Sequence, residues 1–365
     1  MYSSHLESLL IKAVVVILCL DLRTTNAQDF SYDGTMGPDH WGEQYNGCSG
    51  KYQSPINIDL LNVEQISFND LQLKRFDEKP LSGDLLNNGH TVIVHLDYED
   101  EEPTISGGPL NGTFRFAQLH FHWGDNDTYG SEDRINNQSF PAELHMVFYN
   151  TKYGDFDSAV GHSEGVAVLA FFYYLMEEDN PFYADLAFLL TSLQEPDRHV
   201  PFIGAPSLHN LGSTEYEKYF TYVGSLTTPP CSEEVIWIDF EEPVMISRSQ
   251  LDSFRQLYTH DGELITHNNR PIQPLNGRIV QKNFVPYNPF GMGGNHVASA
   301  PIPNFINPGD TKPPPPKKND SSFPQGQNHS HSIPFHAKRR NFSPTTTNID
   351  LLWAVIVFVV FTIFY

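Results

Sequence analysis

Short apolar segments, either continuous or alternating with polar residues, recur along the chain between residues 91 and 240. β-branched and aromatic residues dominate these segments. This composition is typical of β-strands, whose successive side chains point to opposite faces of a sheet. We therefore predict strands over residues 91–98, 114–123, 142–150, 165–175 and 234–240.

Two further segments have the spacing of amphipathic helices. One begins at Asn180, a capping residue that is followed by Pro181, and the other begins at Ser247, where Gln250 completes a capping box. The apolar stripes of these helices comprise Leu186, Leu189, Leu190 and Leu193, and Leu251, Phe254, Leu257 and Tyr258. We predict a mixed α+β, mainly β fold: a single domain with a large twisted, mostly antiparallel central sheet and short peripheral helices.

Changes in composition divide the chain into four parts. Residues 1–27 contain a short apolar run followed by small residues, as in a secretory signal peptide. Residues 29–283 form one continuous domain, and residues 284–348 are a Pro-, Ser- and Asn-rich segment that predicts an extended stalk. Residues 349–365 are almost wholly apolar but shorter than the ~20 residues of a membrane span. We predict a GPI-attachment signal there, with a membrane anchor as the alternative.

Export changes the meaning of the cysteines and of the asparagines. Once the signal peptide is removed, Cys48 and Cys231 remain, and we expect them to form a disulfide worth about 5 kcal/mol in the chain-entropy model. Two free thiols are the alternative. Asn-x-Ser/Thr sequons on an exported chain are candidate glycosylation sites. They begin at Asn111, Asn126, Asn137, Asn319, Asn328 and Asn341.

The charge of the chain excludes one class of partner. Among 365 residues the formal net charge is −22, so the basic surface of a nucleic-acid-binding protein is absent. The acidic residues lack a chelating spacing, and we expect them to form a soluble, self-repelling surface.

The strand predicted over residues 114–123 points two histidines to the same side. On this strand Gln118, His120 and His122 share one face, and the strand over 142–150 places Glu143 and His145 together in the same way. If the two strands pair, three imidazoles meet. Three protein ligands and an open fourth position are typical of catalytic zinc. Gln118 and Glu143 are then predicted to accept the outer N–H groups of the ligands. Ordinary sheet histidines are the alternative.

Several motifs together resemble the α-class carbonic anhydrases across residues 29–283. The motifs are SPINI (54–58), NNGH (87–90), FRFAQLHFHWG (114–124), GSE (130–132), AELHMV (142–147), GSLTTPPC (224–231) and NNRPIQPLNGR (268–278). The resemblance implies reversible hydration of carbon dioxide to bicarbonate and a proton. It also implies that a zinc-bound hydroxide is the nucleophile, with Zn²⁺ on His120, His122 and His145.

The resemblance further implies roles for the residues around the metal. Thr227 would accept a hydrogen bond from the hydroxide and donate one to Glu132, since a carboxylate only accepts. His90 would be the proton shuttle, with Tyr32 and Asn88 ordering the connecting water. Substrate would contact Val147, Val168, Leu226, Thr227, Thr228 and Trp237, while Gln118, Glu143 and Asn268 would surround the ligands.

Two positions depart from the family pattern. Ile93 stands where many members have a polar residue of the water network, which predicts slower proton transfer. Asp133 stands where a histidine commonly supports the residue equivalent to Glu143, which puts the tuning of that carboxylate in doubt.

The resemblance also points to a subtype. Cys48 and Cys231 match the disulfide of the secreted and membrane-bound branch. We therefore predict a GPI-anchored enzyme on the outer face of the plasma membrane, with a single-pass or secreted form as the alternative. Sulfonamides or anions would inhibit it, and no protein partner is indicated.

Two other classes of function were weighed. An adhesion module derived from this family would typically have lost a zinc histidine, whereas all three candidates are present. An acidic matrix or mineralisation protein that also hydrates carbon dioxide is expected to carry acidic repeats, which the sequence lacks. The enzyme is the prediction that agrees best with the residues.

Overall fold

The computed structural model describes residues 30–284. The predicted signal peptide, most of the predicted stalk and the C-terminal apolar segment lie outside the described residues. The strands are β1 (Asn57–Ile58), β2 (Glu64–Ile66), β3 (Gln72–Lys74), β4 (Ser82–Asn87), β5 (Val92–Asp97), β6 (Thr104–Gly107), β7 (Leu110–Trp123), β8 (Arg134–Ile135), β9 (Ala142–Asn150), β10 (Val166–Met176), β11 (Arg198–Pro201), β12 (Tyr219–Ser225), β13 (Glu233–Ser247) and β14 (Gln281–Asn283).

The helices in this region are all short. The α-helices are α2 (Trp41–Gln44), α3 (Phe156–Ala159), α4 (Ala184–Leu190), α5 (Leu208–Leu211) and α6 (Arg248–Phe254). The 3₁₀ turns are η1 (Gly34–Met36), η2 (Asn46–Ser49), η3 (Thr151–Tyr153) and η4 (Pro181–Tyr183). Between residues 30 and 284, no helix combines the length and the apolar character that crossing a membrane requires.

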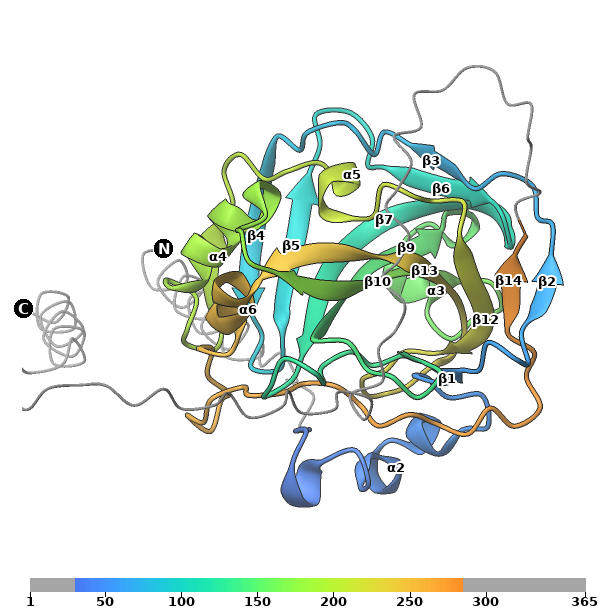
Figure 1. Ribbon diagram of the computed structural model, residues 1–365, viewed down its shortest axis with the longest axis horizontal. Helices are drawn as coiled ribbons and strands as arrows, with labels where there is room; N and C mark the ends of the chain where they lie inside the picture. The colour runs from blue at the N-terminus through green and yellow to red at the C-terminus, as the bar shows by residue number, and fades with distance from the viewer. Residues whose placement is uncertain (1–29, 285–365) are drawn as a thin grey trace, which may run out of the picture. The chain divides into compact units, whose positions relative to one another are not determined.

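A twelve-stranded sheet runs through the centre of the described region (Figure 1). Its main path is β11-β4-β5-β7-β9-β10-β13-β12-β14-β2, and β6 joins β7 to β3. The pairs β10–β13 and β14–β2 are parallel, and the other pairs along the path are antiparallel. The predicted fold class is confirmed, as are the five predicted strands, which correspond to β5, β7, β9, β10 and β13.

The two predicted helices are present but shorter than their apolar stripes implied. Asn180 accepts the N–H of Phe182, but the segment begins with the 3₁₀ turn η4, and α4 ends before the buried Leu193. The capping box of Ser247 and Gln250 opens α6 as predicted. That helix ends at Phe254, so Leu257 and Tyr258 belong to the following loop. Although both helices end earlier than predicted, Leu193 and Leu257 beyond their ends are still buried.

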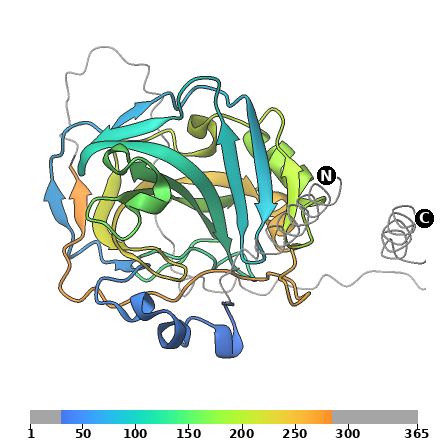
Figure 2. The ribbon, with the colours of Figure 1, turned by 180° about the vertical axis from the view of Figure 1, so that it is seen from behind.

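The sheet buries apolar side chains on both faces. One face packs a large cluster to which α4, α5 and α6 contribute Leu186, Leu190, Leu208, Leu211, Leu251 and Phe254. The opposite face packs a second cluster around Val147, Val168 and Trp237. In both views α4 and α6 lie beside each other, next to β4 and β5 (Figures 1 and 2). The short helix α3 contributes Phe156 and Ala159 to the second cluster, and this second face carries the histidines.

A β-bulge in β7 decides which side chains reach that face. The register between β7 and β9 shifts between Phe116 and Gln118, so Ala117 is an extra residue. The extra residue reverses the alternation, and Phe116 packs in the same cluster as Phe121. A strand without the bulge would place Phe116 beside His120 on the histidine face.

Candidate active site

The three candidate zinc ligands meet at one place on the sheet. His120 in β7 lies directly opposite His145 in β9, and His122 follows two residues later on the same face. One ring nitrogen from each lies within 4.8 Å of the others. The prediction that the three imidazoles converge is therefore confirmed.

Hydrogen bonds on the outer side of the rings determine which nitrogens face inward. The outer pairs are His120 Nδ1 with Gln118 Oε1 (3.1 Å), His122 Nδ1 with the carbonyl oxygen of Asn268 (2.8 Å) and His145 Nε2 with Glu143 Oε1 (2.8 Å). Each acceptor holds the ring proton on that nitrogen. Nε2 of His120 and His122 and Nδ1 of His145 are left as the inward lone pairs. The predicted hydrogen bonds from His120 to Gln118 and from His145 to Glu143 are thus present.

Burial keeps these imidazoles neutral. It lowers the pKa of His145 to about 3 and holds the pKa values of His120 and His122 well below their ordinary range. Within residues 30–284, Nε2 of His122 is buried without a hydrogen-bond partner. A neutral imidazole whose inward nitrogen carries a lone pair can bind a metal ion. The donor set therefore fits zinc, whose catalytic sites use three protein ligands and leave the fourth position to water.

One oxygen of Glu143 bonds to His145, and backbone groups support the other. Its Oε2 accepts the N–H groups of Glu132 (2.8 Å) and Asp133 (3.0 Å), which lower its pKa, although burial raises that pKa to about 8. The side chain of Asp133 instead accepts the N–H of Ile56 (2.7 Å) and the hydroxyl of Tyr222 (3.2 Å). Replacing the family histidine by Asp133 therefore leaves the two hydrogen bonds to Oε2 in place.

Glu132 lies between the histidines and Thr227. Burial raises the pKa of its carboxyl group well above the ordinary value, while a hydrogen bond from the Thr227 side chain acts against that rise. Its Oε1 accepts the backbone N–H of Arg270 at 2.8 Å, and Oε2 lies 3.3 Å from Nε2 of His122. The structure thus brings Thr227 and Glu132 together beside the ligands. Sequence reasoning missed this contribution of Arg270, because no side-chain pattern indicates a backbone donor.

An apolar row crosses the sheet beside the histidines. Val147, Val168 and Trp237 are directly paired on β9, β10 and β13, and all three are buried. The ring of Trp237 lies edge-on to His145, with centroids 4.9 Å apart. Leu226 is half-buried against the same cluster, and Thr228 is half-buried beside Thr227. The predicted substrate wall therefore adjoins the candidate metal position.

The predicted shuttle, His90, lies half-buried in the turn between β4 and β5. Asn88 accepts the backbone N–H groups of His90 (3.0 Å) and Thr91 (2.8 Å), so its carbonyl oxygen shapes the turn. Ile93 on β5 is paired directly with His120 on the neighbouring strand β7. Burial and the negative charge of Glu132 raise the pKa of Tyr32 well above its ordinary value. The influence of Glu132 indicates that the Tyr32 hydroxyl lies near the site, and the raised pKa keeps this hydroxyl neutral.

Asn268 ties the site to the turn. Its side-chain oxygen accepts the N–H of Trp123 (2.7 Å), and its amide nitrogen donates to the carbonyl oxygens of His90 (3.0 Å) and Phe121 (2.9 Å). Its own carbonyl oxygen orients His122. The predicted place of Asn268 next to the ligands is confirmed, and the structure adds that it connects them to His90.

One buried carboxyl group, Asp239, was missed by sequence reasoning. It is fully buried on β13, paired with Ala170 and Phe220, and within residues 30–284 neither oxygen has a hydrogen-bond partner. Burial raises its pKa well above the ordinary value, and the negative charges of Asp133 and Glu143 raise it further. A charged residue within the otherwise apolar run 235–240 was the available signal. Folding therefore favours the neutral form of Asp239 relative to the unfolded chain.

The raised pKa of Asp239 predicts that the protein loses stability as the pH rises. Because the folded pKa exceeds the unfolded value of about 4, the stabilisation from the neutral form is complete below that value and is lost as pH rises through the folded pKa. Asp239→Val should raise the free energy of unfolding at pH 8 by about 2 kcal/mol and flatten its pH dependence. Denaturant unfolding of the zinc-loaded protein between pH 6 and 9 measures both. Asp239→Asn, which cannot titrate, should also flatten the profile, and parallel profiles for all three proteins would contradict the assignment.

The predicted disulfide is present between Cys48 and Cys231. It packs in a small cluster with Phe30 and Trp41, next to Tyr32. The sequons at Asn111, Asn126 and Asn137 are exposed, as glycosylation requires, and the other three lie outside the described residues. Glycosylation itself stays a prediction.

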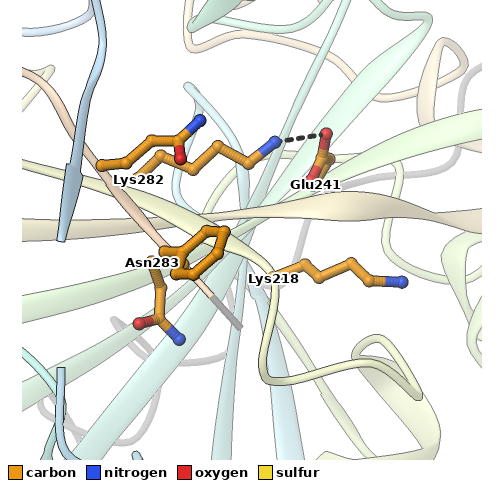
Figure 3. Close-up of a pocket in the computed structure, with 6 residues that line it drawn as sticks. Lys218, Glu241, Lys282 and Asn283 are labelled. Carbon is orange, nitrogen blue, oxygen red and sulfur yellow. Dashed lines mark hydrogen bonds and ion pairs between the residues drawn. The ribbon is translucent and has the colours of Figure 1, made fainter. Parts of the chain in front are cut away.

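A surface pocket lies at the far edge of the sheet, several strands from the histidines (Figure 3). Lys282 donates to Glu241 at 2.9 Å, and Lys218 pairs with Glu215 at 3.3 Å. Its lining comprises Gln65, Lys218, Glu241, Lys282, Asn283 and Phe284. Because carboxylates pair with both lysines, the pocket does not present an uncompensated positive charge to an anion.

Comparisons with known proteins agree with the geometry. A family model described as eukaryotic-type carbonic anhydrase matches residues 36–284. Carbonic anhydrase 7 of Mus musculus is 38% identical over 261 residues, which are 70% of this chain and 97% of the relative. Carbonic anhydrase 3 of Bos taurus is 35% identical over 269 residues (71% and 99%), and carbonic anhydrase 1 of Monodelphis domestica is 36% identical over 265 residues (70% and 98%).

Proposed function

The chain belongs to the eukaryotic-type carbonic anhydrase family, whose reaction is the reversible hydration of carbon dioxide, and we propose that it performs this reaction with zinc on His120, His122 and His145 and a proton shuttle at His90. We further propose that it acts at the outer surface of the cell. The observation that carries the proposal is the convergence of three neutral imidazoles, each with its outer nitrogen already bonded to an acceptor.

The metal contributes one chemical function to this site. Zinc, when bound, lowers the pKa of a coordinated water to near 7, which supplies a strong nucleophile at physiological pH. The residues of the chain do the rest. Gln118, Glu143 and the carbonyl oxygen of Asn268 hold the imidazoles in the required tautomers, and in doing so they make the ligand set rigid.

Thr227 and Glu132 orient the nucleophile. Glu132 already accepts the backbone N–H of Arg270 at Oε1, so its other oxygen is the acceptor available to the Thr227 hydroxyl. A hydroxyl that donates to a carboxylate must accept at its own oxygen from the next group. Thr227 therefore accepts a hydrogen bond from the nucleophile. This hydrogen bond orients the nucleophile so that one of the nucleophile's lone pairs points towards the substrate.

Carbon dioxide is small and apolar, and the row of Val147, Val168 and Trp237 offers a matching surface beside His145. Leu226 extends this surface, and the hydroxyl of Thr228 is placed to contact bicarbonate. Because this apolar wall binds the gas only weakly, carbon dioxide can be exchanged rapidly for the ionic product, bicarbonate.

Zinc-dependent activity is the test of this function. The purified extracellular portion should contain about one zinc per chain, since one set of three imidazoles is present in the described region. Carbon dioxide hydration, followed by stopped flow, should disappear on chelation, return on zinc addition and be inhibited by a primary sulfonamide. A metal-free preparation with native circular dichroism that remains inactive after zinc addition would overturn the proposal.

The extracellular location rests on separate support. The disulfide between Cys48 and Cys231 is typical of oxidising compartments, and three sequons are exposed. The apolar runs at residues 13–20 and 349–365 have the composition of a signal peptide and a GPI-attachment signal.

Enzymatic release tests the anchor. Phosphatidylinositol-specific phospholipase C should release the carbonic anhydrase activity from intact cells that express the full chain. A matched chain in which a known transmembrane helix replaces residues 349–365 should remain bound. Retention of the unaltered chain would show that a membrane-spanning anchor holds it instead.

A further inference from the structure

A second histidine, His260, packs against the turn that carries His90. The His260 imidazole lies directly over Gly89, and a Cβ atom added at Gly89 would overlap its Nδ1 and Cε1 atoms. The centroids of the His90 and His260 rings are 6.2 Å apart, with the planes tilted by 57°. The two imidazoles are therefore neighbours although 170 residues separate them in the sequence.

The surroundings of His90 differ on its two sides. The ring of Phe30 stacks on it at 3.9 Å with the planes 13° apart, and this apolar ring cannot carry a proton. His260 is a polar ring neighbour of His90. At this separation, one bridging water is sufficient to connect a nitrogen of each imidazole.

His260 also has a route outward. Its Nε2 lies 3.2 Å from Oδ2 of Asp197, and the side chains of His260 and Asp197 are 39% and 78% exposed. With Nε2 directed at the carboxylate, the Nδ1 edge of the ring faces Gly89 and the turn of His90. The three groups are arranged in order of increasing contact with solvent: His90 is half-buried, His260 is more open and Asp197 is exposed.

We propose that His260 is a second proton acceptor, which receives the proton from His90 and passes it to solvent beside Asp197. The proposal rests on the shuttle role of His90 proposed above. In the step, an N–H bond of protonated His90 breaks and its proton goes to the bridging water. That water gives up a proton of its own to Nδ1 of His260, so one proton moves and the water is regenerated.

Asp197 lies at the outer end of the relay. Its Oδ2 is 3.2 Å from Nε2 of His260 and accepts a hydrogen bond from the Nε2–H group. After Nδ1 has received a proton, Nε2–H gives up its own proton to the exposed carboxylate, to buffer or to bulk water. Ile93 on β5, opposite His120, stands where many family members have a polar residue of the water network. Proton release through His260 is one physical means of compensating for that missing polar residue.

The test compares His260→Phe with two other variants. Phenylalanine keeps an aromatic ring against Gly89 but cannot carry a proton. In weak buffer we expect kcat for carbon dioxide hydration to fall about threefold with kcat/KM unchanged, because proton release limits kcat alone. Asp197→Asn should give a smaller decrease in kcat. Added imidazole should restore kcat in His260→Phe, since a soluble acceptor replaces the missing ring.

His209→Phe is the matched control. His209 has a similar exposure of 38% and lies near Asp77, with 3.9 Å between Nδ1 and Oδ1, but no ring contact with His90 is present in the described region. Its kcat should be unchanged. The double variant His90→Ala/His260→Phe should be no slower than His90→Ala, because a relay cannot act once its donor is absent.

The outcomes separate the relay from the function on which it rests. If His90→Ala leaves the buffer-limited kcat unchanged, the shuttle role fails and the relay fails with it. If His90→Ala lowers kcat but His260→Phe does not, only the relay is overturned. A fall in kcat/KM together with kcat in His260→Phe, or no recovery with imidazole, would assign His260 a purely structural role and would also overturn the relay.

Discussion

His145→Ala should lose its zinc and, at micromolar free zinc, lower kcat/KM for carbon dioxide hydration by about 1,000-fold or more. The variant removes one of three converging nitrogens and leaves two, which is too few to hold zinc firmly while keeping a position open for water. It also removes the Nε2–H donor from Oε1 of Glu143. Metal content by elemental analysis and stopped-flow hydration are the two measurements.

His145→Ala is also expected to destabilise the fold. A control variant therefore has to separate this loss of stability from the loss of zinc. Glu143 is fully buried and would keep only the backbone N–H groups of Glu132 and Asp133 as donors. We expect the free energy of unfolding to fall by about 2 kcal/mol, the usual penalty for a buried group that loses its partner. The double variant His145→Ala/Glu143→Gln should recover part of this stability but no zinc. A stable His145→Ala protein that retains stoichiometric zinc would contradict the ligand assignment.

Thr227→Val should keep its zinc and lower kcat/KM by about 100-fold, in the range found for losing one preorganised transition-state hydrogen bond. Valine has nearly the same shape as threonine but lacks the hydroxyl that bonds to Glu132 and that we propose orients the nucleophile. The ligands and their outer hydrogen bonds do not involve Thr227. Metal content should therefore be unaffected, which distinguishes this variant from His145→Ala.

Thr227→Ser supplies the matched control, because serine restores the hydroxyl without the methyl group. It should recover most of the activity that Thr227→Val loses. A serine variant as slow as the valine variant would show that the methyl group, and hence packing, matters more than the hydrogen bond. Zinc loss in Thr227→Val would instead show that the residue acts on the metal site.

Much of the fold follows from the local pattern of the chain. Runs of β-branched and aromatic residues predicted five central strands, including the four longest, because such residues pack well on the faces of a buried or half-buried sheet. Capping residues located both helix starts, at Asn180 and Ser247, since the first N–H groups of a helix need nearby acceptors. The ends of those helices were overestimated, because a buried leucine after a helix looks the same in sequence as one inside it.

The candidate ligands could be named from the sequence, but their convergence could not be derived from either strand alone. His120 and His122 share a face by alternation, whereas the third ligand depends on the pairing of β7 with β9 in the register that sets His120 opposite His145. A shift of one residue in that register would point the His145 side chain to the opposite face of the sheet, into the other hydrophobic cluster. The family motifs supplied this long-range information, which propensity does not contain.

Other features arise only in the tertiary structure, because they join residues distant in the chain or depend on backbone atoms. The bulge at Ala117 lets Phe116 and His120 take opposite faces, although simple alternation places them together. The backbone carbonyl of Asn268 and the backbone N–H of Arg270 orient the site, and backbone groups are identical in every sequence except at proline. The neighbouring rings of His90 and His260 meet across 170 residues. Local pattern determines which side chains are available on each face, and the pairing of distant strands and loops determines which of them act together.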